Sequence, residues 1–194
     1  MARWEPGARE RLVVAAVDLF SEQGYDATTI AQITQRAGVT KSTFFRHFPD
    51  KRDLLAAGQE VLSRLLAEGI TEAPENASPL QAVAAGLERA ANAMATGPID
   101  REMAPRLKAA IAASAELQER DALKSVGLAA AMTTALLARG VPDPTAHLAG
   151  ELGVLAFKQG YAKWSDADHD TNSGPAPYAL AALEDLRAAS KSLG

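Results

Sequence analysis

The chain has 194 residues, of which 47% are hydrophobic, and it has no cysteine and a formal net charge of −4. These values exclude disulfides, thiolate metal sites and cysteine nucleophiles, and they argue against a general affinity for nucleic acids. No apolar run approaches the ~20 residues of a membrane span, and the first residues lack the apolar core of a signal peptide. We therefore expect a cytoplasmic protein without membrane contact.

The first helix is predicted over residues 8–23, where apolar residues recur at helical spacing. Gly24 follows and can turn the chain in a left-handed conformation. A second helix begins at Thr29, because Thr29 and Gln32 match a capping box, and Gly38 ends it.

A third helix begins near Thr40 and runs to about Phe48, where Pro49 stops it. The second and third helices are thus two short helices joined by a tight turn that contains glycine. This arrangement is the sequence signature of a helix-turn-helix.

Two faces of the third helix differ in chemistry. Phe44 and Phe48 are four residues apart and suit the core, whereas Lys41, Phe45 and Arg46 fall on the opposite side. An exposed Phe needs a reason. A recognition helix in the major groove supplies one, because Lys can donate to guanine and an apolar ring can contact a thymine methyl group.

The stretch also combines several residue types at fixed spacings: Leu12, Ala15, Ala16, Leu19, Phe20, Gly24, Tyr25, Thr28, Thr29, Ile33, Ala37, Gly38, Val39, Thr43, Phe44, Phe45, Arg46, His47, Phe48, Lys51, Leu54 and Leu55. With these residues, segment 10–55 resembles the DNA-binding domain of the TetR family of bacterial transcriptional regulators. The resemblance covers about a quarter of the chain.

The resemblance implies a recognition helix over Thr40–Phe48 and a set of DNA contacts. The residues concerned are Thr29, Thr40, Lys41, Ser42, Thr43, Phe45, Arg46, His47 and Lys51. Thr29, His47 and Lys51 would hold phosphates. The residues that would face the major groove are Lys41, Ser42, Thr43, Phe45 and Arg46. Plain surface lysines and a packing role for His47 are the alternatives.

Two positions depart from the family pattern. The family usually has Tyr at position 45, whose hydroxyl reaches a phosphate, and Phe45 lacks that hydroxyl. Thr34 stands where a small Ala is usual, which is expected to loosen the packing of the second helix.

Six more helices are predicted at 51–69, 79–95, 101–113, 116–139, 143–164 and 178–190. No strand pattern or internal repeat is present. We expect an all-α protein with a helix-turn-helix domain at 1–53 and a helical domain for ligand binding and dimerisation at 54–194.

The last two predicted helices carry apolar stripes that could pack against a second subunit. The residues are Leu148, Leu152, Leu155, Leu180, Leu183 and Leu186. Glycines in the first of the two helices, among them Gly153 and Gly160, would permit close helix approach. The spacing alone does not separate a dimer interface from monomer core. The resemblance favours a homodimer through the last two helices, and hence a pseudo-palindromic operator.

Family members commonly hold a small-molecule effector among their later helices. The large flexible or aromatic side chains available for such a pocket are Met94, Met103, Leu107, Met132, Phe157, Tyr161 and Trp164. Each of them also suits ordinary core. Because few polar residues interrupt these apolar faces, the ligand is expected to be apolar.

No catalytic, cofactor or metal site is predicted. The segment Asp166–Asp170 begins like a calcium loop, but Thr171 and Pro177 replace the required Gly and Glu. The sequence therefore favours a dimeric, ligand-responsive repressor that binds double-stranded DNA and is not an enzyme. The alternatives are a helical small-molecule-binding protein or enzyme with a decayed DNA-binding domain, and a protein-binding bundle.

Overall fold

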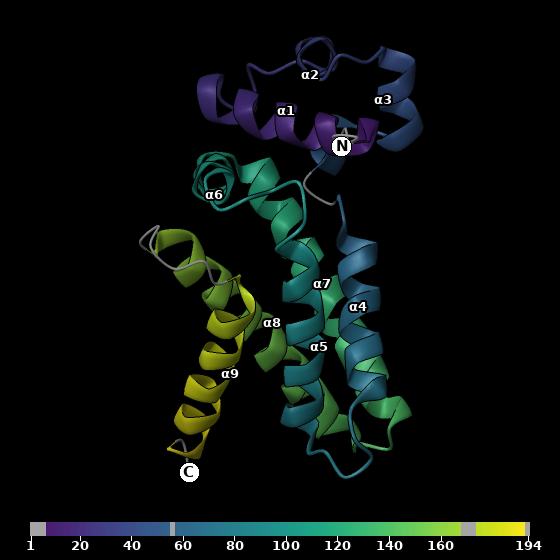
Figure 1. Cartoon of the computed structure of the whole chain (residues 1–194), viewed down its shortest axis with the longest axis vertical. Coiled ribbons are helices and arrows are strands. Elements are labelled where there is room, and N and C mark those ends of the chain that lie inside the picture. The colour runs from purple at the N-terminus through teal and green to yellow at the C-terminus, as the bar shows by residue number, and fades with distance from the viewer. Residues whose placement is uncertain (1–6, 55–56, 168–173, 193–194) are drawn as a thin grey trace, which may run out of the picture. The chain divides into compact units, whose positions relative to one another are not determined.

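The computed structural model describes residues 7–54, 57–167 and 174–192, and within these ranges every regular element is a helix. The elements are α1 (Ala8–Gln23), α2 (Ile30–Arg36), α3 (Lys41–His47), the short 3-10 helix η1 (Lys51–Leu54), α4 (Gln59–Glu72), α5 (Pro79–Met94), α6 (Met103–Ala113), α7 (Ala115–Ala138), α8 (Asp143–Asp166) and α9 (Ala176–Lys191). The predicted all-α class with an N-terminal helix-turn-helix is confirmed (Figure 1).

The chain packs as two compact units. The first consists of residues 1–57 and 97–123, and the second of residues 58–96 and 124–194. Helix α6 and the first turns of α7 thus pack with α1–α3, although the sequence expectation assigned them to the second domain. The boundary between independently folding domains stays a prediction.

The core of the first unit lies between α1, α2 and α3, with contributions from α6 and α7. The predicted inward residues of α1 are buried together with Ile33, Phe44 and Phe48. Burying a side chain of this size contributes roughly 1.5–3 kcal/mol. This core fixes the position of α3 relative to α1 and α2.

The segment predicted as one helix over 51–69 is divided, so that prediction is wrong. Residues 51–54 form η1, and α4 begins at Gln59 after Gly58, whose φ is +86°. A residue in the left-handed conformation interrupts a right-handed helix, and glycine adopts this conformation without strain. At the other end, α4 continues past Gly69 to Glu72.

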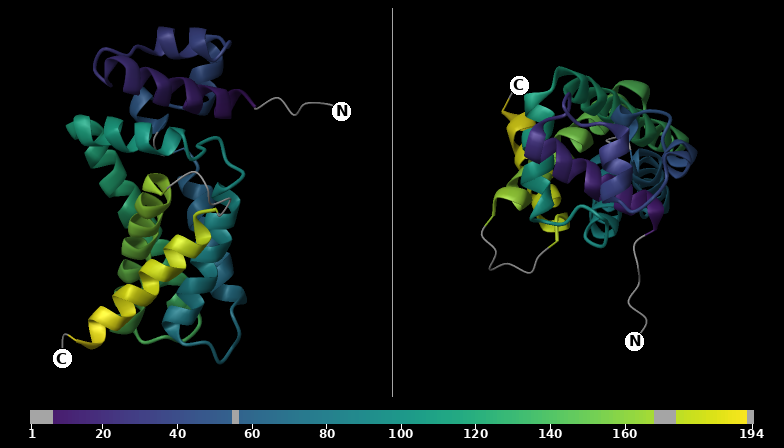
Figure 2. Two further views of the ribbon diagram at one scale, coloured as in Figure 1. Left: turned by 60° about the vertical axis from the view of Figure 1, so that its left-hand side comes forward. Right: turned by 90° about the horizontal axis from the view of Figure 1, so that it is seen from above.

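The second unit depends on close helix approach at glycines. A Cβ atom added at Gly69 of α4 would lie 2.7 Å from the Cα atom of Gly86 in α5. One added at Gly160 of α8 would lie 2.4 Å from the Cα atom of Ala179 in α9. Figure 2 shows α9, in yellow, alongside α8. The close approach predicted for α8 is confirmed at Gly160.

Helix α7 is, among the described residues, long and apolar enough to cross a membrane by length and composition alone. Core helices of water-soluble proteins pass the same test. Leu117 is fully buried in the first core, and Leu128, Met132 and Leu136 are buried in the second. Packing therefore accounts for part of the apolar composition of α7, whereas Leu123, Val126 and Leu137 of the same helix are exposed.

Candidate nucleic-acid interface

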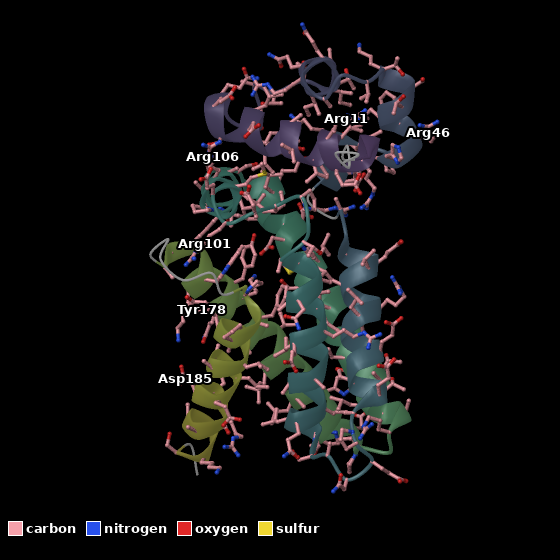
Figure 3. All side chains as sticks on the ribbon, in the orientation of Figure 1. Arg11, Arg46, Arg101, Arg106, Tyr178 and Asp185 are labelled. Atoms are coloured by element: carbon pink, nitrogen blue, oxygen red, sulfur yellow. The ribbon has the colours of Figure 1, made fainter. Side chains whose placement is uncertain are left out.

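Helix α3 presents two opposite faces. Phe44 is fully buried, whereas the next residue, Phe45, is 55% exposed. Lys41 and Arg46 are exposed as well, and Arg46 lies on the outer side of α3 in Figure 3. The helix contains no acidic residue. Its outer face is therefore cationic with one apolar ring, the chemistry of a helix that enters the major groove.

Hydroxyl groups organise the N-terminus of α3. Thr40 has an extended backbone, and its Oγ1 accepts a hydrogen bond from the Thr43 N–H at 3.2 Å, so Thr40 is the N-cap residue. The hydroxyls of Ser42 and Thr43 lie 3.1 and 3.0 Å from the same oxygen. The hydroxyls of these three residues thus form hydrogen bonds at the N-terminus of α3. Their DNA contacts stay predictions.

The turn between α2 and α3 requires a glycine. Gly38 has a φ of +65°, and its N–H donates to the Gln35 carbonyl at 3.2 Å. The N–H of Val39 then reaches back to the Thr34 carbonyl at 3.0 Å. Residues with a Cβ atom are strained in the left-handed region, so this turn is specific to glycine.

The start of α2 is the capping box that the sequence predicts. The Gln32 N–H donates to Thr29 Oγ1 at 3.3 Å, and the Thr29 N–H donates to Gln32 Oε1 at 2.8 Å. Thr34, further along α2, is buried, and its hydroxyl donates to the Ala31 carbonyl at 3.0 Å. Thr34 therefore buries no unpaired hydroxyl, whatever its effect on packing.

The ammonium group of Lys51 points into the first unit. It donates to the carbonyls of Tyr25 at 2.6 Å and Thr28 at 2.8 Å, and it lies 3.8 Å from the centre of the Tyr25 ring. Burial lowers the pKa of Lys51. The backbone N–H of Lys51 is also taken, by Asp50 Oδ1 at 2.5 Å. The structure thus gives Lys51 a packing role, and its predicted phosphate contact stays untested.

Residues 36–52 contain five basic residues and one acidic residue, and ion pairs engage two of the basic residues. Arg36 pairs with Glu22 at 2.5 Å, and this hydrogen bond lowers the pKa of Glu22; Arg52 lies 3.5 Å from Asp50. Among the described residues no ion pair involves Lys41 or Arg46. Lys41 and Arg46 therefore give the outer face of α3 two positive charges without a carboxylate partner in the described part of the chain.

Contacts from α7 brace the helix-turn-helix within the first unit. The Tyr25 hydroxyl donates to Glu116 at 2.8 Å, and Arg120 pairs with Asp53. Burial, with the hydrogen bond to Glu116, raises the pKa of Tyr25. In these pairs the partners are far apart in the sequence, so no local pattern could have indicated them.

The position of His47 is compatible with both predicted roles, a packing role and a phosphate contact. The residue is half-buried, and its ring centre lies 6.4 Å from that of Phe48. This position suits packing at the end of α3, and a phosphate contact stays a prediction.

The residues predicted for a ligand pocket fall in both units. Met103 and Leu107 belong to the first unit, and the other five to the second. Met132 is fully buried and fills the space beside Gly153, since a Cβ atom there would lie 2.8 Å from its sulfur. Met132 therefore acts as core. The rings of Tyr161 and Trp164 lie 5.4 Å apart, and the pocket itself stays a prediction.

The residues predicted for a dimer interface differ in exposure. Leu148 is 61% exposed and Leu155 is 43% exposed, both on α8. Leu152, Leu180 and Leu186 are half-buried, and Leu183 is buried in the second core. The exposed pair leaves an apolar stripe on α8, whereas Leu183 is already packed within its own subunit.

Within the described residues no group of three His, Asp or Glu side chains could hold a metal ion. Asp168, His169 and Asp170 of the calcium-like segment lie outside the described residues.

The N-terminal part of the chain is similar to known families and proteins. The model of the family described as bacterial regulatory proteins, tetR family, matches residues 12–57. The HTH-type transcriptional regulator TcmR of Streptomyces glaucescens is 33% identical over 75 residues, which are 39% of this chain and 33% of that protein. HbdR of Aromatoleum is 47% identical over 47 residues, 24% of this chain and 20% of that protein. The chain thus spans a third or less of these relatives' lengths.

Solved structures resemble the whole fold. The transcriptional regulator FadR of Bacillus subtilis, in complex with stearoyl-CoA, has a TM-score of 0.59 at 19% identity, covering 91% of this chain and 96% of that one. FadR of Thermus thermophilus, a transcriptional repressor in complex with lauroyl-CoA, has a TM-score of 0.53 at 21% identity, covering 92% of this chain and 93% of that one. At such identities the likeness concerns the fold.

Proposed function

The chain carries the helix-turn-helix domain of the TetR family of bacterial regulators, and from this premise we propose that it is a cytoplasmic, ligand-responsive repressor. The protein binds a pseudo-palindromic operator as a homodimer, and a small apolar molecule releases it. One observation carries the DNA-binding part of the proposal: α3 exposes Lys41, Phe45 and Arg46 on one face while Phe44 anchors the other.

The exposed leucines of α8 support the homodimer. Leu148 and Leu155 are seven residues apart and therefore lie on one stripe of the helix. An apolar stripe on a regulator's surface is typical of a protein interface. Two-fold symmetry would place two α3 helices about one turn of DNA apart, roughly 34 Å, and so account for a palindromic site.

The operator is found by selecting duplexes from a random-sequence library with the full chain and by footprinting its upstream DNA. We expect protection of a two-fold-symmetric site. The Lys41→Ala variant is expected to bind this site more weakly by roughly 30-fold or more, because the homodimer loses one base contact in each half-site and each contact contributes about 1–3 kcal/mol.

Lys191→Ala is the matched control, because Lys191 is an exposed lysine at the end of α9 and its loss changes the net charge equally. If both variants bind like the wild type, or lose affinity equally, α3 is not the recognition helix. If no duplex is selected, the operator proposal fails and two alternatives remain. One is a helical small-molecule-binding protein or enzyme with a decayed DNA-binding domain, which the missing hydroxyl at Phe45 supports, and the other is a protein-binding bundle.

An apolar effector is the second part of the proposal. Met94, Phe157 and Tyr161 are half-buried large side chains of the second unit. The two FadR structures described above hold stearoyl-CoA and lauroyl-CoA, in which the acyl chain is the apolar part and the coenzyme A part is charged. Stearoyl-CoA and lauroyl-CoA, titrated into the operator complex, are expected to weaken binding roughly 5- to 150-fold, the usual range of allosteric coupling. Free coenzyme A is the control, since it lacks the apolar chain. If neither thioester acts, or if free coenzyme A acts equally, the effector is not a fatty acyl thioester.

A further inference from the structure

The part of α7 that belongs to the second unit carries an exposed apolar stripe. Val126 is 66% exposed and Leu137 is 39% exposed. Ala130 is exposed as well and lies four residues after Val126 and seven before Leu137, which is the spacing of one helix face. Large apolar residues gathered on one exposed face are typical of an interaction surface.

Helix α8 runs antiparallel to α7 within the second unit. A Cβ atom added at Gly150, near the start of α8, would lie 2.6 Å from the hydroxyl of Thr133 in α7. Eight residues further along α8, the ammonium group of Lys158 donates to the hydroxyl of Ser125, which precedes Thr133 by eight residues, at 3.3 Å. These two contacts define which residues of the two helices lie at the same level.

The exposed leucines of α8 border the stripe of α7. At 1.5 Å of rise per residue, this register puts Val126 within one turn of Leu155 along the helix axis, and Leu137 within one turn of Leu148. Lys158, which reaches α7, follows Leu155 by three residues and so lies beside it on α8. The two stripes therefore form one surface, the α7–α8 face, which consists of Val126, Ala130, Leu137, Leu148 and Leu155.

The area that a stable dimer needs exceeds what α8 alone exposes. A stable protein interface buries about 800 Å² per partner. Leu148 and Leu155 together expose only on the order of 100–200 Å² of apolar surface. The predicted interface leucines of α9 add little, because they are buried or half-buried within their own subunit. Val126 and Leu137 have similar exposed fractions, so they roughly double the apolar area.

We propose that the interface of the homodimer extends over α7, so that a second copy of the chain covers the whole α7–α8 face. The charges on α8 suit this partner, because the exposed side chains of Glu151 and Lys158 carry opposite charges and two copies of the face do not repel each other. The inference rests on the proposed homodimer, and it moves part of the contact from α9 to α7.

The experiment places a charge on the α7 stripe and measures the dissociation constant of the dimer by sedimentation equilibrium of the full chain. Val126→Glu and Leu137→Glu are each expected to raise this constant about 100-fold or more, because two-fold symmetry repeats the substitution in the partner and residues at the centre of an interface dominate its affinity. Circular dichroism checks that each variant is folded, as expected for substitutions at exposed positions.

Val61→Glu is the matched control on α4. Val61 is exposed, and it follows by two residues Gln59, whose side chain meets Gly127 of α7, so Val61 points away from α7. Its dimer is expected to dissociate like that of the wild type. Leu155→Glu tests the α8 part of the face and is expected to dissociate the dimer.

Two results would overturn the inference and leave the homodimer in place. If both α7 variants dimerise like the wild type while Leu155→Glu dissociates, the dimer uses α8 without α7. If Val61→Glu weakens the dimer as much as Val126→Glu does, the loss is a general effect of charge and not a property of the α7–α8 face. A wild-type protein that is monomeric at every concentration would instead contradict the proposed homodimer itself.

Discussion

Replacing Phe44 with alanine is expected to lower the free energy of unfolding of the first unit by about 3–5 kcal/mol and to abolish operator binding. Phe44 is fully buried, and its ring centre lies 5.8 Å from that of Phe48 and 5.3 Å from that of Phe45. Its removal leaves a cavity under α3. Because whole domains are stable by only about 5–15 kcal/mol, such a loss removes a large share of the stability of the unit.

The measurement is urea unfolding followed by circular dichroism, with operator binding on the same preparation. Phe45→Ala is the matched control, one residue away and 55% exposed, and its stability is expected to change by no more than about 0.5 kcal/mol. The pair separates a folding defect from a lost contact. A Phe44→Ala protein that unfolds at the wild-type urea concentration would contradict the core position of this ring.

The inward and outward faces of α3 could be predicted from the sequence because the signal is local. Phe44 and Phe48 repeat at four residues, and Lys41, Phe45 and Arg46 occupy the complementary positions. Capping and glycine turns are local too, since a hydroxyl or a missing Cβ acts within a few residues. The boundaries of the three helices α1, α2 and α3 were therefore predicted to within about two residues.

The features that the sequence did not indicate depend on tertiary contacts and on the backbone conformation at single residues. The ammonium group of Lys51 donates to the carbonyls of Tyr25 and Thr28, which no local pattern indicated, and its predicted phosphate contact stays untested. The predicted helix over 51–69 failed because its apolar spacing continues across Gly58, where the backbone turns left-handed. Hydrophobic periodicity does not indicate such a break in the backbone.

Arg139 makes contacts that a local sequence pattern could not indicate either. Its guanidinium donates to the carbonyls of Thr71, Ala73 and Pro74, where α4 ends. A cation there satisfies carbonyls that have no partner within the helix. The partners are 65 to 68 residues apart in the chain, so the pairing follows from the fold of the second unit rather than from a motif.

Gly160→Val is expected to separate α8 from α9 and to destabilise the second unit by about 3 kcal/mol, the upper end of the usual cost of overpacking. The added Cβ atom would meet backbone, 2.4 Å from the Cα and 2.5 Å from the N atom of Ala179. A side-chain tip could rotate away from such a clash, but a helix backbone must move as a whole. The exposed Ala181 of α9 offers the control Ala181→Val.

The chain contains a probe for this change, because Trp164 lies one turn after Gly160 and is 7% exposed. In a Trp4→Phe background its fluorescence reports urea unfolding around the α8–α9 contact alone. We expect Gly160→Val to unfold at lower urea and Ala181→Val to follow the parent protein. The same variant should lose the symmetric operator footprint, because the proposed dimer requires α8 to be held in place. A wild-type unfolding curve for Gly160→Val would mean that α8 and α9 do not approach this closely, and the footprint would then have no reason to change.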